Sequence, residues 1–172
     1  MVDDRRAEPP SEAKIAALAD RLKERIYATI TMVAVVVGLD LGEAGTVGAA
    51  ATVLTTALGL WLATFVADQQ AHRTVHRSLA TGHALRRMLY VSSPLLSCAV
   101  GLALMISLAA LGVLSLHAAL LVSAGAGVAS LFLWGFLGGM RMGGGALPAV
   151  LAGLVDAAIG VAVVLVKTAA GH

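Results

Sequence analysis

The chain has 172 residues, of which 59% are hydrophobic and only 13% are charged. A soluble domain carries about a quarter charged residues, so this chain has too few charges to cover a core with a solvated surface. Its net charge of +2 does not indicate nucleic-acid binding, because basic residues are expected in the cytoplasmic loops of membrane proteins. Its one cysteine, Cys98, excludes an intrachain disulfide. The composition predicts an integral membrane protein that has the lipid bilayer as its partner.

The N-terminal 25 residues are polar or amphipathic. Residues 1–10, MVDDRRAEPP, end in Pro-Pro and predict a disordered lead. Ser11 stands where the N-cap of a helix over 11–25 would lie. The apolar residues of that helix recur at helical spacing, at Ile15, Leu18, Leu22 and Ile26. We expect an interfacial helix that runs into the first span, the alternative being a stripe that binds a partner helix.

Five continuous apolar blocks follow. They cover roughly residues 26–41, 46–67, 89–114, 116–139 and 146–166. A membrane span needs about 20 apolar residues, so the first block is short, and its helix is expected to begin inside the amphipathic segment and end near Asp40. The sequence therefore predicts an all-α polytopic membrane protein. Five transmembrane helices occupy residues 26–172, preceded by an amphipathic N-terminal helix, with a connection at 68–88.

The basic residues predict the orientation of these spans. Eleven of the twelve Lys and Arg residues fall in the N-terminal tail, in the connection 68–88 or at Arg141, and only Lys167 lies on the other side. Because Lys and Arg accumulate in cytoplasmic loops, the N-terminus and the connection 68–88 are predicted to be cytoplasmic and the C-terminus external. The expected location is the inner (plasma) membrane of the cell.

Asp156 is the outstanding ionisable residue of the apolar blocks. It lies ten residues into the fifth block, where a carboxylate is costly unless it is protonated, paired or hydrated. Gly153 and Gly160 share its helix face, which predicts close packing against another helix. Asp156 is therefore a candidate intramembrane acid of an ion or proton pathway. The alternative is a protonated carboxyl that hydrogen-bonds a hydroxyl of another helix, namely Ser97, Ser107 or Thr55.

The connection 68–88 carries a second candidate site. Asp68, His72, His76 and His83 fall on one face of a helix. Asp68, His72 and His76 follow one another at intervals of four residues, and this spacing can place a carboxylate and two imidazoles around one divalent metal ion.

Two features of the same segment favour other interpretations. Arg73 and Arg77 lie beside the histidines and would repel a cation, and Gly82 favours a helix break before His83. A solvated cytoplasmic face is one alternative, and a pH-sensitive or metal-sensing loop is another.

The remaining motifs of the sequence are packing motifs, and no motif typical of an enzyme is present. Small residues spaced four apart, at Gly135 and Gly139 and at Gly125 and Ala129, are typical of close helix contacts. The sequence has no phosphate-binding loop, dinucleotide motif or nucleophile elbow. We therefore expect no enzymatic activity, and no cofactor other than a divalent cation.

The C-terminal half resembles the vacuolar iron transporter family. The stretches that carry the resemblance are ALLVSAGAGVASLFLWGFLGGMRMGGG and LPAVLAGLVDAAIGVAVVLVK. The resemblance implies five spans, a cytosolic N-terminus and a metal-binding extension between the second and third spans. It implies the scaffold more than the activity, because the acid of the family's first span has no counterpart before Asp40, and the nearest acid to its second-span metal path is Asp68.

These observations support two functional hypotheses. The first is a small membrane protein of transporter-like architecture that moves or senses a cation. The second is a non-transporting accessory or scaffold subunit of a larger membrane complex. Either way, we expect a homo-oligomer or a subunit of a larger assembly.

Overall fold

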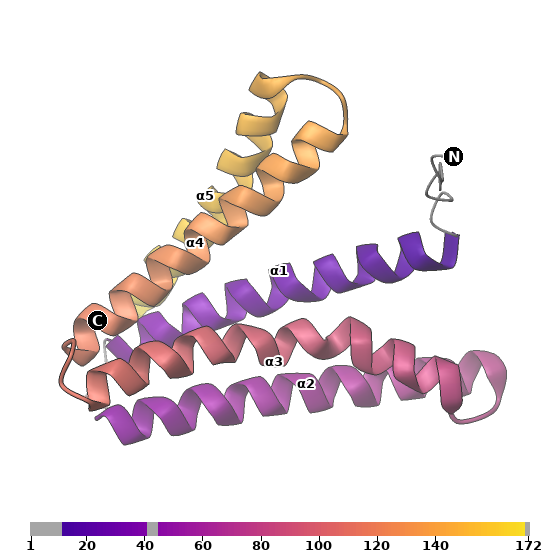
Figure 1. Ribbon diagram of the computed structural model, residues 1–172, viewed down its shortest axis with the longest axis horizontal. Helices are drawn as coiled ribbons and strands as arrows, with labels where there is room; N and C mark the ends of the chain where they lie inside the picture. Colours follow the sequence, from indigo (N-terminus) through magenta and orange to yellow (C-terminus); the bar gives the residue numbers. More distant parts are fainter. Residues whose placement is uncertain (1–11, 41–44, 171–172) are drawn as a thin grey trace, which may run out of the picture.

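A computed structural model of the protein describes residues 12–40 and 45–170. These residues form five α-helices and no strand, which confirms the all-helical prediction. The helices are α1 (Glu12–Asp40), α2 (Thr46–His76), α3 (Gly82–Ala110), α4 (Leu116–Arg141) and α5 (Ala146–Ala170) (Figure 1). The predicted disordered lead, 1–10, and the predicted cap, Ser11, lie outside the described residues.

The amphipathic segment predicted over 11–25 is not a separate helix. α1 continues without a break from Glu12 through Ile26 to Asp40. Among the described residues, four helices, α2 to α5, are long and apolar enough to cross a membrane. α1 is excluded because its first half is charged, with Glu12, Lys14, Asp20, Arg21, Lys23, Glu24 and Arg25.

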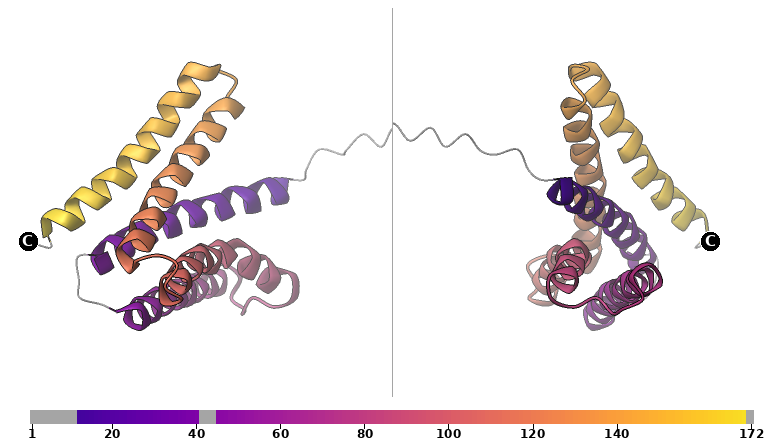
Figure 2. Two further views of the ribbon diagram at one scale, coloured as in Figure 1. Left: turned by 60° about the vertical axis from the view of Figure 1, so that its left-hand side comes forward. Right: turned by 90° about the vertical axis from the view of Figure 1, so that its right-hand side faces the viewer.

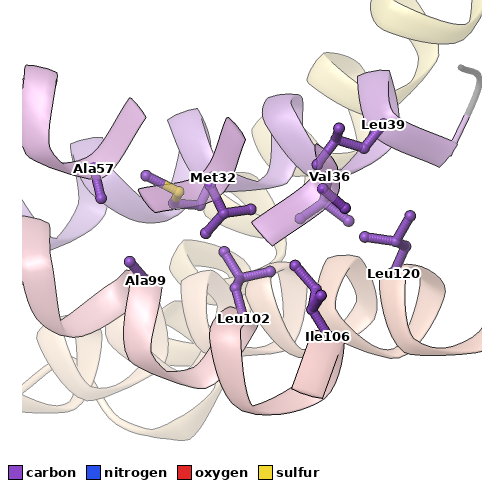
Figure 3. Close-up of a cluster of buried hydrophobic side chains, with 10 residues drawn as sticks. Met32, Val36, Leu39, Ala57, Ala99, Leu102, Ile106 and Leu120 are labelled. Carbon is purple, nitrogen blue, oxygen red and sulfur yellow. The ribbon is translucent and has the colours of Figure 1, made fainter. Parts of the chain in front are cut away.

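The apolar half of α1 lies at the centre of the bundle. Ala28, Met32, Val33 and Val36 are at most 3% exposed. α1 contacts each of the other four helices, and its apolar side chains join those of α2, α3 and α4 in one cluster (Figure 3). Most of this half of α1 is therefore covered by protein, with Tyr27 53% exposed, whereas the outer faces of α2 to α5 expose large apolar side chains.

α2 and α3 form a long antiparallel pair. α2 has 31 residues and α3 has 29, which correspond to about 46 and 44 Å of helix. Both exceed the ~30 Å hydrocarbon core of a bilayer, so the pair is long enough to extend beyond it. Most of the predicted connection 68–88 is consequently helical, and only residues 77–81 lie between α2 and α3.

α4 and α5 form a second hairpin, which packs through small residues. A Cβ atom at Gly139 would lie 2.5 Å from Cα of Ala149, and one at Gly153 would lie 2.8 Å from the carbonyl oxygen of Phe132. The predicted packing role of Gly135 and Gly139 is confirmed, since both are buried against α5. Gly125 makes no such contact within the chain, because it is exposed and has open space beside it.

The two hairpins meet α1 at different angles. α1, α2 and α3 run nearly side by side, whereas α4 and α5 cross them obliquely and diverge toward the turn that joins α4 to α5 (Figures 1 and 2). α1 begins at the end of the molecule that carries the α2–α3 connection. At the opposite end, where α1 stops and α4 starts, Nδ1 of His117 lies 2.6 Å from Oδ1 of Asp40.

Candidate functional site

A charged pocket lies where the start of α1 meets the end of α2 and the start of α3. Its volume is about 920 Å³. α1 contributes Lys14, Asp20, Lys23 and Glu24; α2 contributes Asp68, His72 and His76; α3 contributes His83, Arg86 and Arg87. The pocket therefore gathers all three residues of the predicted metal site, with side chains of both charges.

The histidines reach the pocket from two helices. His72 and His76 are one turn apart on α2, and their ring centroids are 4.4 Å apart. The helix ends directly after them, because Arg77 adopts a left-handed conformation with φ of 55°. α3 begins at Gly82, and its second residue, His83, also lines the pocket. The helix break expected before His83 is therefore present, but His83 still lines the same pocket as His72 and His76.

Most of the charges around the pocket are balanced in pairs. Nη2 of Arg87 lies 3.2 Å from Oδ2 of Asp20, and Nζ of Lys23 lies 3.6 Å from Oε1 of Glu24. Asp68 directly follows Ala67, the last residue of the continuous apolar block of α2, and so lies outside that block. Burial raises the pKa of the Asp68 carboxyl above its usual value; the positive charge of Lys23 opposes this shift, and the negative charge of Asp20 adds to it.

The predicted metal ligands do not form a ready-made coordination site. Among residues 12–40 and 45–170, no group of three or more His, Cys, Asp or Glu side chains is arranged to hold a metal ion. Asp68, His72 and His76 are the right donor types for a divalent cation, but their side chains would have to turn toward one another to share one. Arg73 does not line the pocket, and its Nη2 donates to Oε1 of Gln70 at 2.7 Å.

Asp156 lies apart from this pocket, between α5 and α4. The space for its carboxylate exists because residue 135 is glycine: a Cβ there would lie 2.5 Å from Oδ2 of Asp156. Gly160, on the same face, would bring a Cβ within 2.8 Å of Cδ1 of Leu131. The face of α5 that carries Asp156 is therefore the one that packs on α4.

The hydroxyl partners considered for Asp156 are engaged within their own helices. Ser97 donates to the carbonyl of Pro94, Ser107 to that of Ala103, and Thr55 to that of Ala51. Ser97 and Ser107 lie on α3 and Thr55 on α2, so none belongs to the helix that Asp156 faces. The alternative interpretation, in which Asp156 hydrogen-bonds one of these hydroxyls, therefore does not agree with the α4–α5 packing.

The contribution of α1 to the charged pocket was not anticipated from the sequence. The sequence predicts that the polar face of this helix lies at the membrane interface. The structure instead turns Asp20, Lys23 and Glu24 toward α2 and α3, and places the Arg21 guanidinium 4.2 Å from the ring centroid of Tyr90. One feature of the sequence could have indicated this contact. The polar face of α1 carries both acids and bases, and so does the segment that follows Ala67.

Comparison of the chain with models of protein families, with curated proteins and with solved structures gives no match. The resemblance to vacuolar iron transporters therefore depends on the quoted stretches alone, and it stays a prediction.

Proposed function

We propose that the protein is a five-span membrane protein of transporter-like architecture that binds a cation at its charged pocket. α1 supplies the fifth span through its apolar half, which is largely covered by the other helices. Its charged half then lies on the cytoplasmic side together with the pocket. The positive-inside distribution of Lys and Arg supports this orientation.

The observation that carries the proposal is the meeting of three histidines and three carboxylates in one pocket. Neutral imidazoles offer lone pairs to a divalent cation, and Asp68 adds an oxygen donor one turn before His72. Two of the pocket's four Lys and Arg side chains are already paired with Asp20 and Glu24, which reduces the repulsion that a cation would meet.

Calorimetric titration of the purified protein with zinc tests the proposal. We expect saturable binding at neutral pH that is lost in His72→Ala and retained in His117→Ala. The control histidine lies at the opposite end of the molecule, beside Asp40. Binding should weaken below about pH 6, because an imidazole must be neutral to coordinate a metal. Equal binding by both variants, or none by the unmodified protein, would refute the pocket as a cation site.

A non-transporting accessory subunit is the second proposal, and one observation favours it. Asp156 does not line the charged pocket, so the two candidate sites are not parts of one visible pathway. Ion flux into liposomes that contain only this protein separates the two functions. Flux that disappears in Asp156→Asn supports transport, whereas zinc binding without flux supports a sensing or accessory role.

A further inference from the structure

A second, apolar cavity lies within the bundle, between α1, α3 and α4. Its volume is about 430 Å³, and Thr29, Cys98, Gly101, Ser123 and Ser130 are among the residues that line it. The cavity opens to the outer surface of the helices, since its lining residues Leu104 and Val122 are 61% and 56% exposed. The same helices expose large apolar side chains, so the opening faces the region where lipid would surround the protein.

The polar atoms of this cavity need no polar ligand. The Thr29 hydroxyl donates to the carbonyl of Arg25 at 2.8 Å, and the Ser123 and Ser130 hydroxyls donate to Ala119 and Gly127 at 2.7 Å each. Cys98 Sγ contacts Thr29 Oγ1 at 3.9 Å. With its hydroxyls satisfied inside their own helices, the cavity favours an apolar occupant over water.

A positive charge lies one helical turn from the cavity. Arg25 is four residues before Thr29 on α1, and Trp134 is four residues after Ser130 on α4, so both continue the faces that line the cavity. The Arg25 guanidinium lies 5.2 Å from the Trp134 ring centroid. Among the described residues, no carboxylate lies within ion-pair distance of Arg25. Trp and Arg together are typical of the level where lipid headgroups begin.

We propose that this cleft binds one anionic phospholipid, with an acyl chain in the apolar cavity and its phosphate beside Arg25. Charge complementarity identifies the headgroup, because the guanidinium next to the cavity has no acidic partner among the described residues and matches a phosphate in geometry. The volume lies within the range of sites that enclose apolar ligands. The acyl chain would lie between α1, α3 and α4, in the part of the molecule where α4 runs obliquely to α1 (Figure 2).

Native mass spectrometry of the detergent-purified protein, titrated with phosphatidylglycerol or phosphatidylcholine of the same chain length, tests the site. Gly101→Leu adds a side chain at the cavity wall, because Gly101 lines the cavity and a Cβ there meets nothing within 4 Å. Gly59→Leu is the matched control, since Gly59 is also exposed in a helix with open space beside it and does not line the cavity. Arg25→Gln removes the charge, and Arg25→Lys retains it.

We expect one tightly held phosphatidylglycerol per chain, lost in Gly101→Leu and kept in Gly59→Leu. Arg25→Gln should reduce the preference for phosphatidylglycerol over phosphatidylcholine by about fivefold, and Arg25→Lys should preserve most of it. Inorganic phosphate should not displace the lipid, because the acyl chain contributes to binding. Equal affinity for the two lipids, or an unchanged preference in Arg25→Gln, would overturn the proposal. Unchanged binding in Gly101→Leu would overturn the placement of the chain.

Discussion

Gly135 of α4 and Asp156 of α5 face each other so closely that a Cβ on Gly135 would lie 2.5 Å from Oδ2 of Asp156. The same Cβ would lie 2.8 Å from the carbonyl oxygen of Ala152 and 2.9 Å from Cα of Gly153. Two of these three neighbours are backbone atoms, which cannot move aside as a flexible side chain can. A glycine at 135 is therefore what allows α4 and α5 to approach with a carboxylate between them.

Gly135→Ala should destabilise the protein, because the added methyl group would push α4 away from α5. Overpacking of this kind costs about 1–3 kcal/mol. Gly138→Ala is the control, since a Cβ at Gly138 meets nothing within 4 Å. Thermal unfolding in detergent should show a lower Tm for Gly135→Ala and an unchanged or higher Tm for Gly138→Ala. Equal Tm values would contradict the close α4–α5 contact.

Asp156→Asn should fold with an unchanged Tm, because asparagine keeps the shape of the side chain beside Gly135. Asp156→Leu should lower the Tm, since its two terminal methyl groups crowd the space between the helices. Thermal unfolding of both variants separates shape from charge at this site. If Asn destabilises as much as Leu, the carboxylate makes a structural interaction of its own.

The predicted topology is tested by labelling single cysteines in intact cells, in a Cys98→Ser background. His117→Cys should react with a membrane-impermeant maleimide added outside, because this end of α4 is predicted to be external. His76→Cys should react only after the membrane is permeabilised. Both side chains are exposed in the structure, so burial does not explain a difference. Reversed reactivity would show that the N-terminus is external.

The contact between Asp40 and His117 predicts a specific cross-link between the end of α1 and the start of α4. Cysteines at positions 40 and 117, in the Cys98→Ser background, should form a disulfide on mild oxidation. The pair 76 and 117 is the control, since these residues lie at opposite ends of the molecule. The native Asp40–His117 contact should contribute less than about 1 kcal/mol, because the His117 side chain is 67% exposed. Intramolecular disulfide in the control alone would refute the arrangement of α1 and α4.

The sequence predicted where three of the helices begin, but it did not predict how far α2 and α3 continue into the charged segment between them. The starts of the second, fourth and fifth blocks coincide with those of α2, α4 and α5, since each follows glycine or serine at a turn. The polar composition of 68–88 predicts a connection between spans. Polarity reports solvation and not backbone conformation, so the helices continue through most of it.

The sequence by itself determined that the chain is helical and rich in long apolar segments, and it placed Asp156, Gly153 and Gly160 on one helix face. These properties depend on composition and on the 3.6-residue period, which are local. Only the tertiary structure decided that α4 covers this face and that α1 lies at the centre of the bundle. It also decided that His83 of α3 lines the same pocket as His72 of α2. Such relationships depend on which helices pack together, and many Gly- and Ala-rich faces of this chain offer equally small residues to a neighbour.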